Sequence, residues 1–292
     1  MTVDADSWSS LLQFYSIRHR TAKVEKEVSF EDGTERLLAL FSKHDIHVTF
    51  FVPGRVAEDY AKVIRKAGFK GHEIACHGHD HDKNEFLAGR EYQKRQIMRA
   101  VETISSAAGT EPRGFRAPCL RLNGTTLKIL DEIGFKYDSS ILPTFVPGYY
   151  GSLGAPLAPY HPSGDVVWKE GSLRILEIPV SVNPVFRLPL SAAWMRNFGL
   201  SWVKIGVRTS FALGLPVVFY IHPRDVVPLP KIDGVPWHMY RNIGDSAVRM
   251  LDEIISYAKR LGARFLTGSE LARHHDSPEI SKHSVLTGES LS

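Results

Sequence analysis

Short apolar runs alternate with longer amphipathic segments along most of the chain. Apolar runs rich in β-branched and aromatic residues predict strands, and apolar residues repeating every three or four positions predict helices. The predicted strands are residues 1–4, 47–52, 72–76, 114–116, 137–139, 173–180, 216–222 and 263–267. The predicted helices are residues 32–44, 57–67, 90–107, 124–134, 192–213 and 248–261. We expect Asp32 to be the N-cap of the first helix, with Glu35 completing a capping box, and Asn123 to cap the fourth.

This alternation of strands and helices predicts a parallel α/β architecture, and no linker interrupts it. We therefore expect one barrel-like α/β domain over residues 1–273. Residues 143–164 are rich in Pro and Gly and cannot form a regular helix, while their aromatic residues indicate an ordered wall. The polar, aperiodic residues 274–292 predict a disordered tail.

Composition narrows the class of protein. The chain has 292 residues, of which 43% are hydrophobic and 23% charged, so neither a disordered nor a fibrous chain fits. No apolar run approaches the roughly 18 residues of a membrane span, and no signal peptide is visible. Two cysteines cannot build a disulfide framework, which favours a cytoplasmic protein. The net charge of +4 comes without a long basic block and gives no indication of nucleic-acid binding.

Polar residues that could carry chemistry follow several of the predicted strands. In parallel α/β folds, the loops at the carboxyl ends of the strands gather at one rim, where active sites form. The residues at these positions are Asp4, Asp6, His77, His79, His81, Arg116 and His222. Although they are scattered along the chain, the fold would bring them together.

The segment from His77 to His81 gives the densest signal. These two histidines are four residues apart, so one helical turn or a tight loop can direct both imidazoles at one ion. With a carboxylate from Asp6 they would form the kind of three-ligand site that catalytic zinc uses, and Asp4 could take a proton from water there. The alternative is a polar loop and an ordinary turn, although the place of the histidines after a strand favours metal. We expect His79 to face solvent.

Three further residues have a functional and a structural interpretation. His222 could donate a proton to a leaving group, or it could be a core histidine bonded to the backbone, which its sequence context alone favours. Arg116 could be a surface cation, or it could keep Asp4 ionised and oriented. Cys119 has no evident activating partner, so we do not expect a thiol nucleophile.

Six segments in order along the chain resemble the motifs of one family. They are TVDADSW, VTFFVPG, HEIACHGHDHD, GFRAP, FKYDSS and VVFYIHP. Together they resemble the polysaccharide deacetylases, the NodB-homology or carbohydrate esterase family 4 enzymes, from Thr2 to about Leu271. The resemblance implies a distorted (β/α)7 barrel and metal-dependent hydrolysis of an N-acetyl group or a similar amide.

The resemblance also implies roles for individual residues. Asp4 would be the catalytic base, Arg116 would hold it in place, and His222 would protonate the departing amine. The implied metal ligands are Asp6, His77 and His81. Zn²⁺ is the expected ion, and Co²⁺, Ni²⁺ or Fe²⁺ could occupy the same ligands.

The resemblance further implies a set of residues around the substrate carbonyl. Pro118 would shape the turn after the arginine, and a backbone N–H near Cys119 would help to hold the oxyanion. Asp138 matches a family carboxylate that lies near the histidine of the last motif.

Two departures from the common family pattern leave the substrate open. The first motif is Asp-x-Asp rather than Asp-Asp, which resembles the intracellular branch that includes peptidoglycan-deacetylase-like proteins and cyclic-ureide amidohydrolases. Cys119 stands in place of the usual aromatic residue directly after the Arg-x-Pro of the fourth segment. Our leading hypothesis is deacetylation of an amino sugar in a glycan or glycan precursor. The alternatives are a lipid-linked formamido or acetamido sugar, a cyclic ureide, and a non-catalytic sugar-binding protein on this fold.

The sequence also gives expectations about the partners of the protein. We expect a carbohydrate or amide small-molecule substrate, and a homo-oligomer is compatible with the sequence. Residues 194–211 combine aromatic and basic side chains, as a helix at a bilayer surface would. A barrel helix packed on its strands is the favoured interpretation, and weak membrane association is the alternative.

Overall fold

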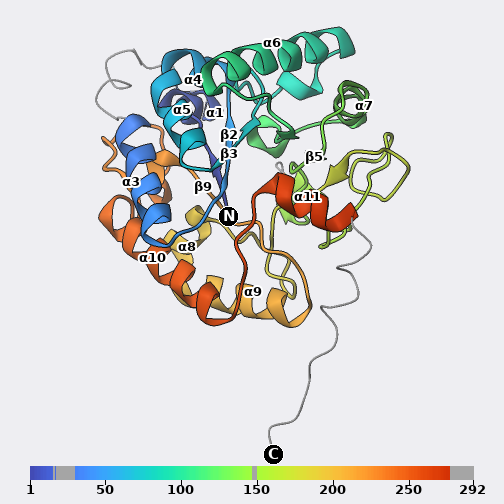
Figure 1. The fold of residues 1–292 in the computed structure, drawn as a ribbon. Helices are drawn as coiled ribbons and strands as arrows, with labels where there is room; N and C mark the ends of the chain where they lie inside the picture. Colours follow the sequence, from blue (N-terminus) through green and yellow to red (C-terminus); the bar gives the residue numbers. More distant parts are fainter. Residues whose placement is uncertain (16, 18–29, 147–149, 277–292) are drawn as a thin grey trace, which may run out of the picture.

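Seven parallel strands form one curled half-barrel in the computed structural model (Figure 1), which describes residues 1–15, 17, 30–146 and 150–276. The strand order is β8-β5-β4-β3-β2-β1-β9, and every neighbouring pair is parallel. The strands are β1 (Thr2–Asp4), β2 (Thr49–Val52), β3 (Glu73–Cys76), β4 (Gly114–Phe115), β5 (Tyr137–Asp138), β8 (Leu176–Glu177) and β9 (Tyr220–Ile221). The predicted α/β barrel class, a distorted (β/α)7 barrel, is confirmed.

Helices cover the outside of this sheet (Figure 1). They are α1 (Trp8–Phe14), α3 (Phe30–Lys43), α4 (Gly54–Asp59), α5 (Ala61–Phe69), α6 (Arg90–Ala108), α7 (Gly124–Ile133), α8 (Ala192–Phe198), α9 (Leu200–Ala212), α10 (Asp245–Arg260) and α11 (Gly268–Asp276). Short 3₁₀ turns follow several strands: η1 (Glu85–Leu87), η2 (Pro118–Leu120), η3 (Pro223–Val226) and η4 (Trp237–Tyr240). No helix in the described ranges is long and apolar enough to cross a membrane.

The central strands are buried on both faces, as expected for a parallel sheet covered by helices. All four residues of β2 are buried, and Val3 of β1 has no exposed surface. The main hydrophobic core joins these strands to the apolar faces of the surrounding helices, for example through Leu37 of α3, Ile97 of α6 and Leu251 of α10. This packing fixes the carboxyl ends of β1, β3 and β4, from which candidate site residues project.

Several predicted helix boundaries are wrong. Helix α3 begins at Phe30, so Asp32 lies in its first turn and is not the N-cap; its carboxylate there still favours the positive end of the helix dipole. The predicted helix 57–67 is two helices, because Tyr60 adopts a non-helical conformation between them. The predicted helix 192–213 is divided at Gly199, whose φ is 90°. By contrast, Asn123 caps α7 as predicted and accepts a hydrogen bond from the Thr126 N–H.

The predicted closing strand 263–267 is absent. Instead, Thr267 and Glu270 form a reciprocal capping box that starts α11, and this local structure replaces the strand. Residues 274–276 of the predicted tail belong to α11, and residues 277–292 lie outside the described residues. The predicted strands 173–180 and 216–222 are each reduced to a two-residue strand, β8 and β9.

The segment 143–164 contains no helix in its described residues, as its composition predicts. It carries a short antiparallel pair, β6 (Phe145–Val146) and β7 (Tyr150–Gly151), separated by residues 147–149 outside the described residues. Tyr160 of the same segment is buried and pairs with Glu177 of β8, so this end of the segment is fixed to the edge of the sheet.

Helices α8 and α9 combine a packed face with exposed aromatic rings. Val203 and Val207 are buried against the core, as a barrel helix requires. The rings of Trp194, Phe198 and Trp202 form a cluster in which Trp194 and Phe198 stack at 4.8 Å. Trp202 also packs against the core, whereas Phe198 is 64% exposed. Residues 194–211 therefore pack on the barrel, as the favoured interpretation expected, and also expose apolar side chains to solvent.

A close contact between α3 and η3 generates the first prediction. A Cβ atom on Gly33 would collide with the backbone carbonyl of Pro223, directly after His222. We expect Gly33→Ala to lower the free energy of unfolding by about 1–3 kcal/mol, because this overpacking exceeds the gain of up to ~1 kcal/mol in helix propensity. Urea denaturation measures the change.

Gly89→Ser is the matched control. Gly89 is the N-cap of α6, has a φ of −65° and has no atom within 4 Å of an added Cβ. Serine favours this position, so the control should be neutral or slightly stabilising. Equal stability of Gly33→Ala and the wild type would show that α3 and η3 are not tightly packed.

Candidate active site

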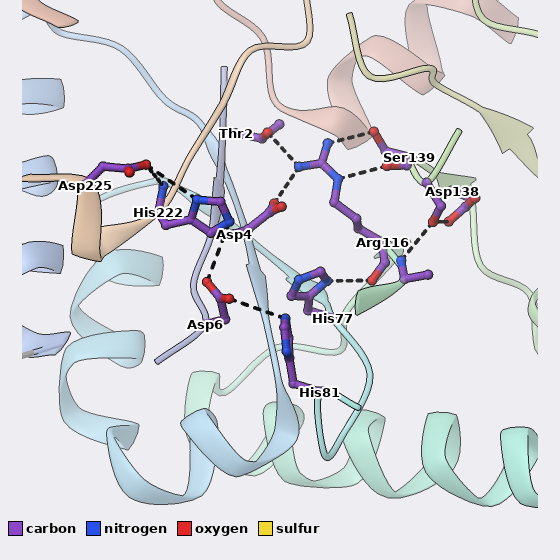
Figure 2. Close-up of polar contacts among 12 residues, drawn as sticks. Thr2, Asp4, Asp6, His77, His81, Arg116, Asp138, Ser139, His222 and Asp225 are labelled. Atoms are coloured by element: carbon purple, nitrogen blue, oxygen red, sulfur yellow. Dashed lines mark hydrogen bonds and ion pairs between the residues drawn. The ribbon is translucent and has the colours of Figure 1, made fainter. Parts of the chain in front are cut away.

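Candidate residues from four strand ends converge on one small cavity of about 140 Å³ (Figure 2). Its lining includes six residues singled out in the sequence: Asp4, Asp6, His77, His81, Cys119 and His222. They follow or end β1, β3, β4 and β9, so the rim predicted from the alternation of strands and helices is where the polar side chains meet. Arg116 lies behind Asp4, and Arg224 completes the polar wall.

Arg116 holds Asp4 through a completely buried ion pair. Its Nη1 lies 2.6 Å from Asp4 Oδ1 and also donates to Thr2 Oγ1, while its Nε and Nη2 donate to the backbone and hydroxyl oxygens of Ser139. The guanidinium also stacks on the Phe51 ring, 4.1 Å from its centroid. Burial acts to raise the pKa of Asp4, but the charge of Arg116 and the nearby histidines outweigh it, so the pKa lies below its usual value.

Asp6 lies between two cationic or potentially cationic groups. Arg224 Nη1 is 2.7 Å from Oδ1, and His81 Nε2 is 3.5 Å from Oδ2. Burial would raise the pKa of Asp6, but Arg224, His222 and His81 lower it well below its usual range. Arg224 therefore fixes Oδ1, which also lies 3.8 Å from His222 Nε2, and Oδ2 faces His81.

The two histidines are in the form that metal ligands require. Burial lowers the pKa of His77, and it lowers that of His81 to about 4, so both imidazoles are neutral at pH 7. His77 Nδ1 donates to the Arg116 carbonyl at 2.7 Å, which leaves Nε2 as the electron-pair donor. His81 Nδ1 is buried without a hydrogen-bond partner in the described structure.

The chemistry of these residues suits a divalent transition metal, while the ligand atoms of Asp6, His77 and His81 do not all lie within 4.8 Å of one another. The donor set is two neutral imidazoles and an ionised carboxylate, which is the composition of a catalytic zinc site. The 3.5 Å between His81 Nε2 and Asp6 Oδ2 is close to the ~3.4 Å edge of a tetrahedron with zinc–ligand bonds of about 2.0–2.1 Å. The backbone carbonyl on His77 and the guanidinium on Asp6 supply the outer contacts that orient such ligands.

His222 is oriented by residues that the sequence analysis did not single out. Its Nδ1 lies 3.5 Å from Asp225 Oδ2, and its backbone N–H donates to the same oxygen at 2.9 Å. Arg196 of α8 completes the chain with an ion pair of 2.9 Å to Asp225 Oδ1. Burial opposes ionisation of Asp225, but Arg196 and His222 lower its pKa well below its usual range. The buried carboxylate thus faces the imidazole as an anion.

The turn after β4 has an unusual backbone. Cys119 and Leu120 have φ values of 56° and 55°, in the left-handed region that non-glycine residues rarely adopt. The Leu120 and Arg121 N–H groups donate to Ala117 and Pro118, whereas no hydrogen bond of the Cys119 N–H is found in the described chain. Pro118 is buried and starts this turn, and the strained loop places Cys119 at the wall of the cavity.

Asp138 lies away from His222, on β5 behind the Cys119 turn. It is completely buried, accepts a hydrogen bond from Ser140 Oγ, and does not line the cavity. Ser140 in turn accepts from the Ala117 N–H. Burial raises the pKa of Asp138, and that of the adjacent Glu177 lies well above its usual value. Asp138 therefore supports the turn after β4 through Ser140. The carboxylate beside His222 is that of Asp225.

The histidine loop is held by a glutamate that the sequence analysis also missed. Glu85 is buried and accepts hydrogen bonds from the N–H groups of His79 and Asp82. Burial raises the pKa of Glu85 to about 7. The expectation that His79 faces solvent is wrong: it has no exposed surface, because its ring packs directly against the backbone of Gly54.

A second, larger cavity of about 490 Å³ adjoins the first, and both are lined by Ser10 and His81. Its wall combines aromatic and charged side chains, among them Tyr60, Tyr92 and Asp80. Asp80 is fixed by Arg55, whose Nε lies 2.6 Å away, and by Gln96. Rings together with oriented polar groups suit a ligand that has both flat apolar faces and many hydroxyl groups.

Comparison with protein-family models gives two matches that follow each other along the chain. A model described as Polysaccharide deacetylase matches residues 23–137, and one described as Domain of unknown function (DUF3473) matches residues 139–260. Among curated proteins, a peptidoglycan deacetylase of Helicobacter pylori is 32% identical over 249 residues, covering 75% of this chain and 85% of the relative. A peptidoglycan deacetylase-like protein of Gibberella zeae is 31% identical, covering 51% of this chain and 46% of the relative.

Solved structures share the same fold. A putative polysaccharide deacetylase from Mycobacterium smegmatis has a TM-score of 0.66 and 25% identity, covering 94% of this chain and 88% of its own. The allantoinase PuuE has a TM-score of 0.58 and 21% identity, covering 85% of this chain and 74% of its own. At that identity the second likeness shows the fold alone.

The surroundings of the cysteines generate the second prediction. Burial, with Asp6 nearby, raises the pKa of Cys119 to about 12, and burial raises that of Cys76 to about 12. At pH 8 the thiolate fraction is then about 10⁻⁴, against roughly a quarter for an unperturbed cysteine. We expect iodoacetamide to label both cysteines more than about a hundredfold more slowly in the folded protein than in urea. Rapid labelling of Cys119 in the folded protein would contradict this and make the thiol a candidate nucleophile.

Proposed function

The chain belongs to the polysaccharide deacetylase family, and we propose that it is a metal-dependent hydrolase that removes N-acetyl groups from amino sugars of a glycan or glycan precursor. The convergence of Asp4, Asp6, His77, His81 and His222 on one cavity carries this proposal. Aspartate, histidine and an ordered water are the groups that amide hydrolysis requires, and a binding protein would have no need to bury their charges. The name of the Helicobacter pylori relative, a peptidoglycan deacetylase, supports the same class of substrate.

Asp6, His77 and His81 would hold the metal ion, with zinc as the expected species. A divalent ion at this position would supply Lewis acidity to the substrate carbonyl and to water. Arg224 keeps Oδ1 of Asp6 occupied, so the protein offers the ion Oδ2 and the two imidazoles.

Asp4 is the proposed general base. Arg116 occupies Oδ1 of Asp4, so Oδ2 is the oxygen that accepts a proton from the attacking water. The lowered pKa of Asp4 keeps the carboxylate ionised over the physiological pH range, ready to accept that proton. Because Arg116 itself is bonded to Ser139 and Thr2, the guanidinium that orients the base cannot move without breaking several buried hydrogen bonds.

The Cys119 N–H and His222 would act on the substrate as the carbon–nitrogen bond breaks. The Cys119 N–H is the proposed donor to the oxygen that becomes negative when water attacks the carbonyl. His222 would then give a proton to the leaving nitrogen, so that acetate and a free amine result. Asp225 stabilises the positively charged imidazole that this step needs.

The adjoining cavity favours an extended sugar substrate. It is more than three times the volume of the cavity that holds the reacting groups, and it opens from the same histidine, His81. Tyr60 and Tyr92 offer surfaces for sugar rings, while Arg55 and Asp80 offer oriented partners for hydroxyl groups. A neighbouring sugar of a glycan would bind there while its N-acetyl group reaches Asp4.

Replacement of the base tests the proposal. We expect Asp4→Asn to lower the rate of acetate release from N-acetylglucosamine oligomers by about 10²–10⁴-fold, because the amide cannot accept the proton of the attacking water. The fold and the bound metal should persist, since Asn keeps the shape of the side chain and Asp4 is not a proposed ligand. Acetate release and metal content of the zinc-reconstituted protein are measured together.

Asp233→Asn is the matched control, because it removes a carboxylate from an exposed position outside the cavity. It should retain wild-type turnover. An active Asp4→Asn protein would refute the assignment of the base. Absence of acetate release by the metal-loaded wild type on both soluble oligomers and polymeric peptidoglycan would refute the proposed substrate class.

A further prediction concerns the carboxylate beside His222. Asp225 Oδ2 lies 3.5 Å from His222 Nδ1 and accepts a hydrogen bond from the His222 backbone N–H, so it orients the imidazole. We expect Asp225→Asn to lower kcat by about tenfold or more with little change in KM, because the proposed acid loses the anion that orients it. Steady-state kinetics of acetate release measure both constants.

Two further measurements separate this role from a purely structural one. Asp225→Glu, which keeps the charge, should recover part of the lost kcat. If Asp225→Asn loses folded protein by circular dichroism but keeps the wild-type kcat per folded molecule, Asp225 only supports the fold through Arg196.

A further inference from the structure

A second cluster of metal-binding side chains lies outside the active site. His161, in the loop before β8, meets His275 and Asp276 at the end of α11, and one potential ligand atom from each lies within 4.8 Å of the others. The imidazole Nε2 of His161 is 3.9 Å from Asp276 Oδ1, and His275 Nδ1 is 3.6 Å from the same oxygen. No other group of three or more His, Cys, Asp or Glu residues in the described ranges meets this criterion.

The spacing of these atoms suits an ion better than direct contact. Distances of 3.6 and 3.9 Å exceed the 2.7–3.2 Å of a hydrogen bond. The edge of a tetrahedron with metal–ligand bonds of about 2.0–2.2 Å is ~3.4 Å, so small movements of these partly exposed side chains would place all three around one zinc ion.

A backbone contact prepares His161 for this role. Its Nδ1 lies 3.2 Å from the Ile175 carbonyl, an oxygen that only accepts, so the proton resides on Nδ1 and Nε2 keeps its lone pair. That lone pair is on the side of the ring nearest Asp276. A histidine ligand whose other nitrogen donates to a carbonyl is the usual arrangement in metal sites.

The cluster lies at a different part of the barrel from the catalytic cavity. Helix α11 begins beside the amino ends of the strands, where the Gly268 and Ser269 N–H groups donate to Thr49 of β2 and Glu73 of β3. The catalytic residues follow the carboxyl ends of the same strands. Figure 1 shows α11 beside the loops that precede β8, which brings together segments far apart in the sequence.

We propose that His161, His275 and Asp276 bind a second zinc ion, with water as the fourth ligand, and that this ion fastens α11 to the loop before β8. The ion is structural: it closes a long stretch of chain, as a disulfide would in an oxidising compartment. It does not depend on the proposed catalytic activity, because it shares no residue with the catalytic cavity.

The experiment is equilibrium dialysis of the full chain against zinc alone, followed by elemental mass spectrometry. We expect His161→Ala and His275→Ala each to bind one zinc ion fewer per chain than the wild type. His77→Ala, which removes a proposed catalytic ligand, should keep the second ion, and addition of His161→Ala to it should remove that ion. If the proposed catalytic site binds no zinc, the wild type and every variant except His77→Ala will contain fewer zinc ions per chain than expected. The difference between His161→Ala and the wild type will remain.

His274→Ala is the matched control, because His274 adjoins His275 on the same helix and is not part of the cluster. It should bind as much zinc as the wild type, and zinc should raise the unfolding temperature of both proteins more than that of His275→Ala. Equal zinc content in His275→Ala and the wild type would overturn the proposal. An equal loss in His274→Ala would also overturn it, because it would reveal non-specific binding to surface histidines.

Discussion

Three buried arginine–aspartate pairs are the constraint on which the site depends. Arg116 holds Asp4, Arg224 holds Asp6 and Arg196 holds Asp225, at 2.6, 2.7 and 2.9 Å. Burial of a charge is costly unless a partner and hydrogen bonds compensate it, and loss of one partner typically costs about 3–5 kcal/mol. Each carboxylate of the site is therefore fixed in position by the same interaction that allows it to be ionised inside the protein.

The same pairs divide the site into charged and neutral groups. The pKa values of Asp4 and Asp6 are lowered, as are those of His77 and His81, so anionic carboxylates stand beside neutral imidazoles. A lowered carboxyl pKa stabilises the fold above the ordinary value of 3.8, and this contribution is lost as the pH falls below it. The charge pattern that catalysis needs thus also stabilises the fold at neutral pH.

Much of this arrangement could be predicted from the sequence, for an identifiable reason. Asp4, His77 and His222 each follow an apolar run, and a parallel sheet brings the carboxyl ends of such runs to one rim. What could not be predicted is pairing between distant segments. Arg196 lies on a helix within an aromatic-rich segment, and only the folded structure, in which α8 packs against β9, shows that it reaches Asp225.

The contacts that the sequence analysis missed depend on local backbone conformation. Asp225 is three residues after His222, a spacing typical of a capping turn, but its role depends on the η3 conformation that the chain adopts there. Glu85 supports the histidine loop through backbone N–H groups, which leave no trace in the sequence. The misplaced start of α3 and the missing strand 263–267 are local differences, and a capping box between Thr267 and Glu270 accounts for the second of them.

The position of β9 at the edge of the sheet has a consequence for how the protein loses activity. Asp4, His77 and Arg116 lie on or after interior strands, but His222 follows a strand of two residues that pairs with β1 alone within the sheet. Edge elements with few backbone hydrogen bonds open at a lower free energy than the core. Opening of β9 would therefore separate the acid from the base while the interior strands stay paired. On warming, catalytic activity would then be lost at a lower temperature than secondary structure. The temperature of inactivation would measure the local stability of β9 and not the stability of the whole domain.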